Sequence, residues 1–125
     1  MGATTVWEHW DGMREDGTMW STSMNSFNHY AYGSVADWLY GKAAGINTDE
    51  SEPAFRHIIF EPLTDGRLSY VKASIETRNG TVKSEWKTEN GMTTYVFTVP
   101  EGCTATVILN GEKTEVGAGE HIFSK

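Results

Sequence analysis

Apolar and polar residues alternate along the second half of the chain with the two-residue period of β-strands. Within 68–77, Val71, Ala73 and Ile75 are apolar and the residues between them are polar. One side of this strand is therefore expected to be buried. The same pattern predicts further strands over 57–60, 81–87, 92–99 and 104–109, and a last short hairpin pairing 113–116 with 121–123.

Asn-Gly pairs separate three of the predicted strand pairs, at Asn79-Gly80, Asn90-Gly91 and Asn110-Gly111. Both residues of such a pair adopt positive φ angles readily, which suits the two-residue turn of a β-hairpin. Three of these turns between alternating strands predict an antiparallel arrangement, most simply a β-sandwich.

The first half of the chain has a helical period instead. Between residues 25 and 44, apolar and small residues recur at spacings of three and four, and they form one broad stripe: Phe27, Tyr30, Ala31, Ser34, Val35, Trp38 and Leu39. Ser23 or Asn25 can cap the start of this helix, and Gly45 can end it. A lone helix cannot bury such a stripe, so other helices, which this sequence does not encode, are needed to cover it.

The two periods divide the chain near Pro53. We predict a mixed fold in which a short helical segment within residues 1–53 precedes an all-β antiparallel sandwich over residues 54–125. The polar, glycine-rich stretch 11–23 is expected to be a loop.

Composition narrows the possible partners. The 125 residues carry a formal net charge of −7 and no run of Lys or Arg, which argues against nucleic acid and against an anionic membrane surface. No stretch is apolar for long enough to span a bilayer, and the first residues lack the pattern of a signal peptide. The one cysteine, Cys103, lies in a β-rich stretch next to the predicted strand 104–109, where a small buried side chain is the expected role.

The candidate chemistry is concentrated in Thr4–Asp11, where Trp7 and Trp10 flank Glu8. Indole rings stack on the flat apolar faces of sugars, and a carboxylate held beside them can act as a general base. The alternative is an amphipathic edge in which both tryptophans are core residues and Glu8 faces water. Asp11 follows closely, but Asp-Gly is also a common turn pair.

Other polar and aromatic residues have two interpretations each. His29 lies off the helical stripe and could reach a substrate hydroxyl, or it could be a packing histidine. His9, His57 and His121 show no metal-ligand spacing with each other or with carboxylates, so no metal site is predicted. No cofactor is predicted either. Tyr70, Trp86 and Tyr95 could form a sugar-stacking surface on the sandwich, or they could be core.

Taken together, the motifs resemble the C-terminal part of bacterial α-L-rhamnosidases of glycoside hydrolase family 78. The resemblance rests on GATTVWEHWD at 2–11, on SMNSFNHYAYGSV at 23–35, on WLY at 38–40, and on FRHIIFEP at 55–62 with LSYVKAS at 68–74. It implies that the helical segment is the end of an (α/α)6 barrel.

The resemblance also implies roles for single residues. Glu8 would be the general base of an inverting hydrolysis of terminal α-L-rhamnosyl linkages, His29 would contact the rhamnose, and Trp7 would shape the pocket. The family often has Arg where this chain has His9. The general acid of the family lies in an upstream part of the barrel, and no Asp or Glu here resembles its motif.

The resemblance therefore predicts a C-terminal fragment that is inactive alone, that needs the missing N-terminal part of its polypeptide, and whose free stripe favours self-association. Its ligand would be a rhamnose-containing glycan or glycoside. Two alternatives remain: a carbohydrate-binding module without catalysis, and a structural cap for the barrel. The compartment is not predicted.

Overall fold

A computed structural model describes residues 4–23 and 25–125, so Gly2, Ala3 and Met24 of the motifs above lie outside it. The described chain forms two compact units that divide between Asp37 and Trp38. The elements follow one another as α1 (Tyr30–Trp38), the π-helix η1 (Leu39–Ala43), β1 (Ile46–Thr48), β2 (His57–Phe60), β3 (Tyr70–Thr77), β4 (Gly80–Glu89), β5 (Met92–Val99), β6 (Thr104–Leu109), β7 (Glu112–Val116) and β8 (Gly119–Ser124).

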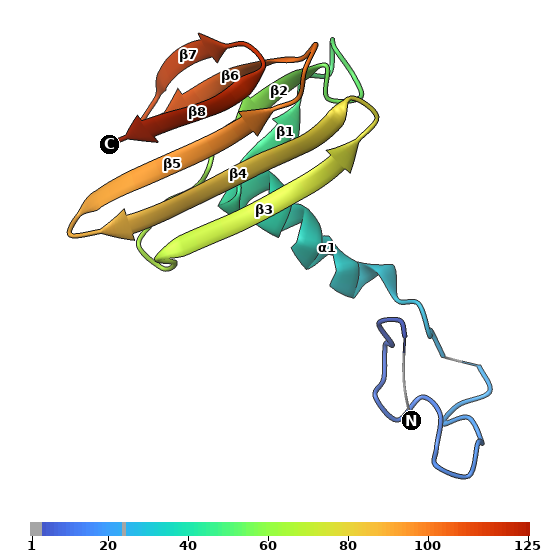
Figure 1. The fold of residues 1–125 in the computed structure, drawn as a ribbon. Helices are drawn as coiled ribbons and strands as arrows, with labels where there is room; N and C mark the ends of the chain where they lie inside the picture. Colours follow the sequence, from blue (N-terminus) through green and yellow to red (C-terminus); the bar gives the residue numbers. More distant parts are fainter. Residues whose placement is uncertain (1–3, 24) are drawn as a thin grey trace. The chain divides into compact units, whose positions relative to one another are not determined.

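The second unit is a sandwich of two four-stranded sheets (Figure 1). One sheet has the strand order β1-β2-β6-β7 and the other β3-β4-β5-β8. The predicted fold class, a short helical segment followed by a mostly antiparallel sandwich, is confirmed. The hairpins β4–β5 and β6–β7 turn at the predicted pairs Asn90-Gly91 and Asn110-Gly111. The β3–β4 hairpin turns one residue earlier than predicted, at Arg78 and Asn79, because Gly80 is already the first residue of β4 and pairs with Thr77. One pair of strands, β2 and β6, is parallel, which the sequence did not indicate.

The core lies between the two sheets, where the inward residues of alternating strands meet. Phe60 of β2 stacks on Phe97 of β5 with ring centroids 4.5 Å apart, and both are fully buried. Val71, Ala73 and Ile75 pack against this core from β3, as their alternation predicted. Cys103 is 4% exposed and is buried, in the role expected for it.

The last predicted hairpin is wrong. β7 pairs with β6, whereas β8 leaves for the other sheet and pairs with β5, so that Phe97 is opposite His121. The short connection at Gly117 and Ala118 therefore crosses from one sheet to the other. The alternation of apolar and polar residues identifies a strand, but it does not determine which other strand it pairs with.

The helix is shorter than predicted. α1 begins at Tyr30 rather than near Asn25, and the Asn25 side chain donates to the Ser21 carbonyl and caps no helix. η1 continues α1 to Ala43, and Gly45 follows with φ +70°. A Cβ on Gly45 would lie 2.1 Å from the Pro62 nitrogen, so this position needs glycine both for its backbone conformation and for its close contact.

The sandwich holds the end of η1 through two buried hydrogen bonds. Trp86 Nε1 donates to the Ala43 carbonyl at 2.8 Å, and Ser84 Oγ donates to the Ala44 carbonyl at 2.6 Å. Helix ends leave their last carbonyls without intrahelical partners, and these two side chains from β4 supply them.

Candidate active site

The candidate residues lie in the first unit, where two stretches of chain run side by side. The Glu8 amide donates to the Ser26 carbonyl at 2.9 Å, and the His29 amide donates to the Val6 carbonyl at 2.8 Å. The Thr5 hydroxyl donates to the Phe27 carbonyl between the same two stretches. Residues 21 positions apart are thus brought onto neighbouring segments, so that Glu8 and His29 belong to one small region.

Aromatic contacts support this pairing. The Trp7 and Phe27 rings meet edge to face, with centroids 4.9 Å apart and planes inclined by 78°. Trp7 is half-buried. Phe27, which the helical pattern placed on the stripe of the helix, instead lies in the irregular segment before α1 and packs on Trp7.

Glu8 itself is half-buried. Among residues 4–23 and 25–125 its carboxylate has no hydrogen bond or ion pair. A carboxylate partly shielded from water and not engaged with another side chain remains able to accept a proton from a bound water. His29 is half-buried too, and it precedes α1 instead of lying on its surface.

A tight turn follows Glu8. The Gly12 amide donates to the His9 carbonyl at 3.0 Å, and Asp11 is an exposed residue of this turn, as the alternative interpretation of Asp11 expected. Gly12 is buried, and a Cβ there would lie 3.0 Å from the His9 carbonyl oxygen. The sequence does not predict this close approach of Gly12 to the His9 carbonyl. The presence of glycine at position 12 is the one local feature that is consistent with it.

The predicted loop 11–23 folds back on itself. The Trp20 amide donates to the Gly12 carbonyl at 3.0 Å, and the His9 and Trp20 rings lie 4.7 Å apart. At its tip, the Thr18 hydroxyl and amide donate to Asp16, and these bonds hold the pKa of that carboxyl below its usual value. The loop therefore places a second aromatic ring beside the residue that follows Glu8.

The two tryptophans that flank Glu8 differ in exposure. The amphipathic-edge alternative requires both tryptophans to be core residues. Trp10 is 85% exposed, so it does not meet this requirement. On the sandwich, Trp86 and Tyr95 are 2% and 3% exposed and belong to the core, whereas Tyr70 is 62% exposed. A stacking surface made from all three of these sandwich aromatics is therefore excluded.

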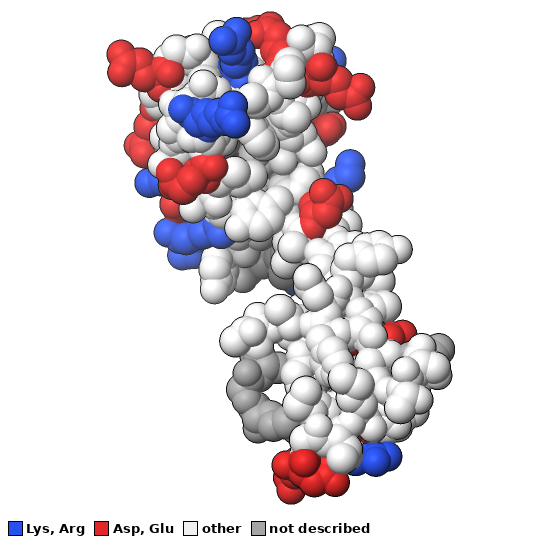
Figure 2. All heavy atoms as spheres, turned by 90° about the vertical axis from the view of Figure 1, so that its right-hand side faces the viewer, with Lys and Arg blue, Asp and Glu red and all other residues white. Residues whose placement is uncertain are grey.

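Large apolar side chains are exposed along the helix. They are Tyr30, Val35, Trp38, Leu39 and Tyr40. Between residues 30 and 43 the sequence carries only Asp37 and Lys42 as charged residues. Figure 2 shows many Asp, Glu, Lys and Arg side chains over the sandwich. Four residues of the predicted stripe, Tyr30, Val35, Trp38 and Leu39, are therefore exposed among the described residues.

Within the described part of the chain, no group of three or more His, Cys, Asp or Glu is placed to hold a metal ion. Its helices are also too short or too polar to cross a membrane.

Comparison with known proteins places the chain in a class. Residues 1–43 match the model of the bacterial α-L-rhamnosidase 6 hairpin glycosidase domain, and residues 45–124 match that of the bacterial α-L-rhamnosidase C-terminal domain. The class is that of six-hairpin glycosidases followed by a C-terminal β-domain. The chain belongs to the bacterial α-L-rhamnosidase family.

Several relatives share this similarity. An α-L-rhamnosidase of Streptomyces avermitilis is 37% identical over 98% of the chain, and one of Alteromonas sp. is 33% identical over 94%. The crystal structure of the Streptomyces avermitilis enzyme complexed with L-rhamnose superposes with a TM-score of 0.78, as does that of the Aspergillus terreus enzyme. The chain spans only 12–14% of the length of these two curated relatives and 14% of each solved chain.

Proposed function

We propose that this chain supplies the general base of an inverting α-L-rhamnosidase that hydrolyses terminal α-L-rhamnosyl linkages, and that Glu8 is this base. The observation that carries the proposal is the backbone hydrogen bonding between residues 6–8 and residues 26–29. It brings the segment of Glu8 next to the segment of His29. Among the described residues, the Glu8 carboxylate has no partner. The rhamnosidase activity named for the relatives gives the substrate class.

In the proposed reaction, a water molecule lies between Glu8 and the anomeric carbon. Glu8 takes a proton from the water as its oxygen attacks, and the glycosidic bond breaks on the opposite face of the sugar. A second carboxyl group, about 6.5–9.5 Å from the base in inverting enzymes, gives its proton to the leaving oxygen. We place this acid in a part of the parent polypeptide outside these 125 residues.

His29 and Trp7 take binding roles in the proposal. His29 would hydrogen-bond a hydroxyl of the rhamnose, because its ring carries both a donor and an acceptor when neutral. Trp7 would form part of the pocket wall, and its contact with Phe27 fixes its ring. Neither residue needs a cofactor for this work.

The remaining partner is the rest of the barrel. The uncharged, exposed stripe of the helix is the type of surface that other helices cover, and in their absence it is expected to favour self-association. The division into residues 1–53 and 54–125 stays a prediction; the two matched family models meet between residues 43 and 45.

The 125-residue chain alone is expected to show no rhamnosidase turnover. It holds the proposed base but not the general acid that protonates the leaving oxygen. The measurement is release of p-nitrophenol from p-nitrophenyl α-L-rhamnoside, with the proposed parent enzyme as the positive control. Turnover by the purified chain would show that the acid lies within it and would contradict this part of the proposal. Replacing Glu8 by Gln in the parent enzyme tests the role of the base itself.

A second role, that of a structural cap, is favoured by one observation. Trp86 and Ser84 of the sandwich bind the last carbonyls of η1 with buried hydrogen bonds. This role is compatible with the first, because a domain that fixes the end of a barrel helix can do so while Glu8 acts elsewhere.

A further inference from the structure

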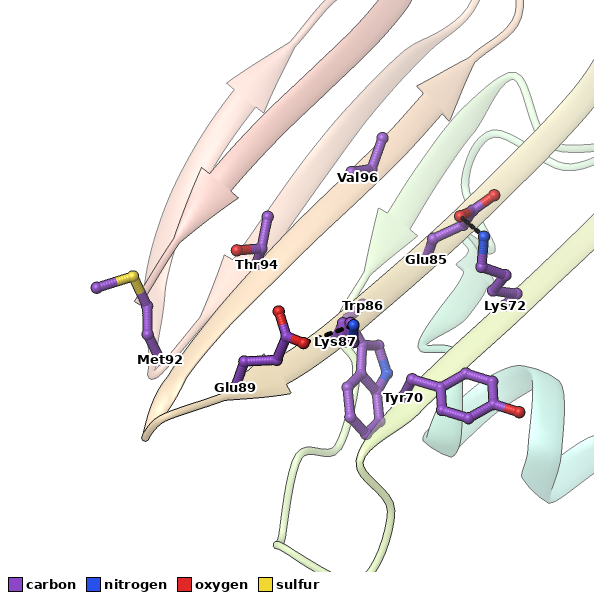
Figure 3. A pocket seen from close by; sticks show the side chains of 9 residues that line it. All are labelled: Tyr70, Lys72, Glu85, Trp86, Lys87, Glu89, Met92, Thr94 and Val96. Atoms are coloured by element: carbon purple, nitrogen blue, oxygen red, sulfur yellow. Dashed lines mark ion pairs between the residues drawn. The ribbon is translucent and has the colours of Figure 1, made fainter.

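The outer face of the sheet formed by β3, β4 and β5 carries an open hollow of about 650 Å³ (Figure 3). Tyr70, Lys87 and Thr94 lie next to one another across the three strands in register, and all three line it. It is far in the sequence from Glu8, and none of its lining residues has a place in the proposed hydrolysis.

Exposed apolar groups lie at this hollow. Tyr70 is 62% exposed and Met92 is 59% exposed, and Val96 also lines the hollow. Single exposed apolar residues are ordinary, but an exposed aromatic ring at a concave surface with polar groups around it is the usual arrangement of a small-molecule site.

The charges in the hollow are paired with each other. Lys72 Nζ lies 2.8 Å from Glu85 Oε2, and Lys87 Nζ lies 2.6 Å from Glu89 Oε1. The hydrogen bond to Glu85 raises the pKa of Lys72, so Lys72 is protonated at neutral pH. Two cations and two anions leave no net charge, and a charged ligand therefore finds no unpaired partner here.

The paired charges also distinguish a sugar from a protein surface. An apolar protein surface covering the ion pairs Lys72–Glu85 and Lys87–Glu89 would remove the water that hydrates them. It would offer no hydrogen bonds in place of those made by that water, so the desolvation would cost free energy. A pyranose offers hydroxyl groups, which donate to carboxylates and accept from ammonium groups. Its apolar face can meanwhile pack on the Tyr70 ring.

We propose that this hollow binds a neutral pyranose unit of a glycan, with the sugar on the Tyr70 ring and its hydroxyls on Glu85 and Lys87. Its lining residues differ from those proposed for hydrolysis, and the hollow would hold a glycan to the sandwich. It rests on the proposed function only for the choice of L-rhamnose as the probe.

The test is a titration of the ¹⁵N-labelled 125-residue chain with L-rhamnose, followed by the amide signals of β3, β4 and β5. We expect saturable shifts at Tyr70, Lys87 and Thr94 with a millimolar dissociation constant, weakened about tenfold or more in Tyr70→Ala. Tyr40→Ala, which removes an exposed tyrosine from η1 outside the hollow, is the matched control and should bind like the parent chain. Absence of shifts at these amides, or equal binding by Tyr70→Ala, would overturn the proposal.

A second measurement uses the proposed parent enzyme. Tyr70→Ala is expected to weaken its retention on an immobilised rhamnose-containing polysaccharide while leaving kcat on a small soluble rhamnoside unchanged. If the variant instead lowers thermal stability with no change in retention, the face packs against another part of the polypeptide and the sugar site is wrong. Failure of Glu8 as the base would appear in kcat and would leave these binding results untouched.

Discussion

Replacing Glu8 by Gln in the proposed parent enzyme is expected to lower kcat by about 10²–10⁴-fold, the usual contribution of a general base. Gln has nearly the shape of Glu but cannot accept the proton of the attacking water. Rhamnose binding should be largely kept, because the proposed sugar contacts belong to His29 and Trp7. The measurement is steady-state kinetics together with calorimetric binding of L-rhamnose to the variant.

The matched control for this prediction is Glu15→Gln. Glu15 lies in the exposed loop that follows Glu8 and has no proposed role in the reaction. Its variant should retain the turnover of the parent enzyme. Unchanged turnover in Glu8→Gln would rule out a base at this position and would leave the structural and binding roles of the chain.

Replacing Trp86 by Ala is expected to destabilise the sandwich by about 3–5 kcal/mol, which is the range for a large aromatic removed from a core. Trp86 is 2% exposed, and its Nε1 is the donor to the Ala43 carbonyl. The substitution leaves a cavity between the sheets and a buried carbonyl without its partner. Both effects act in the same direction.

Urea unfolding of the 125-residue chain measures this loss as a shift of the midpoint of the sandwich transition. Trp10→Ala makes the same substitution at a residue that is 85% exposed, and it should change the free energy of unfolding by less than about 0.5 kcal/mol. Equal midpoints for the two variants would show that Trp86 does not hold the core together.

The strands could be predicted because their signals are local. Asn90 and Gly91 have φ angles of 51° and 80°, and Asn110 and Gly111 have 52° and 80°, the positive values for which Asn-Gly is selected in hairpin turns. Alternation likewise identified the buried face of β3 and β4. The partners of β7 and β8 could not be predicted in this way, because Gly117 and Ala118 permit either a hairpin or a crossing between sheets.

The start of the helix shows a different limit. Residues 25–29 have apolar spacing that continues the helical period, yet their backbone groups bond to 5–8 instead. Hydrogen bonds to a segment about twenty residues earlier determine the conformation of residues 25–29. The pattern of apolar residues within 25–29 contains no information about these hydrogen bonds. The helix prediction therefore began five residues too early.

The candidate site was reached through the resemblance more than through spacing. Trp7 and Glu8 in one segment indicated sugar chemistry, but nothing local related Glu8 to His29. The hydrogen bonds that the Val6 and Ser26 carbonyls accept from the His29 and Glu8 amides bring the two segments together. Every residue has a backbone carbonyl, so the sequence does not indicate which of them pair. The sequence likewise does not show that Ser84 and Trp86 donate hydrogen bonds to the carbonyls at the end of η1.

The most direct test of the proposed base is the configuration of the sugar that the parent enzyme first releases. Proton NMR of the hydrolysis of an α-L-rhamnoside, recorded before mutarotation, distinguishes the two anomers. A general base at Glu8 predicts β-L-rhamnose, because water attacks from the face opposite the leaving group. Release of α-L-rhamnose would mean a covalent intermediate and a nucleophilic carboxylate, and would contradict the assignment of Glu8 as the base of an inverting reaction.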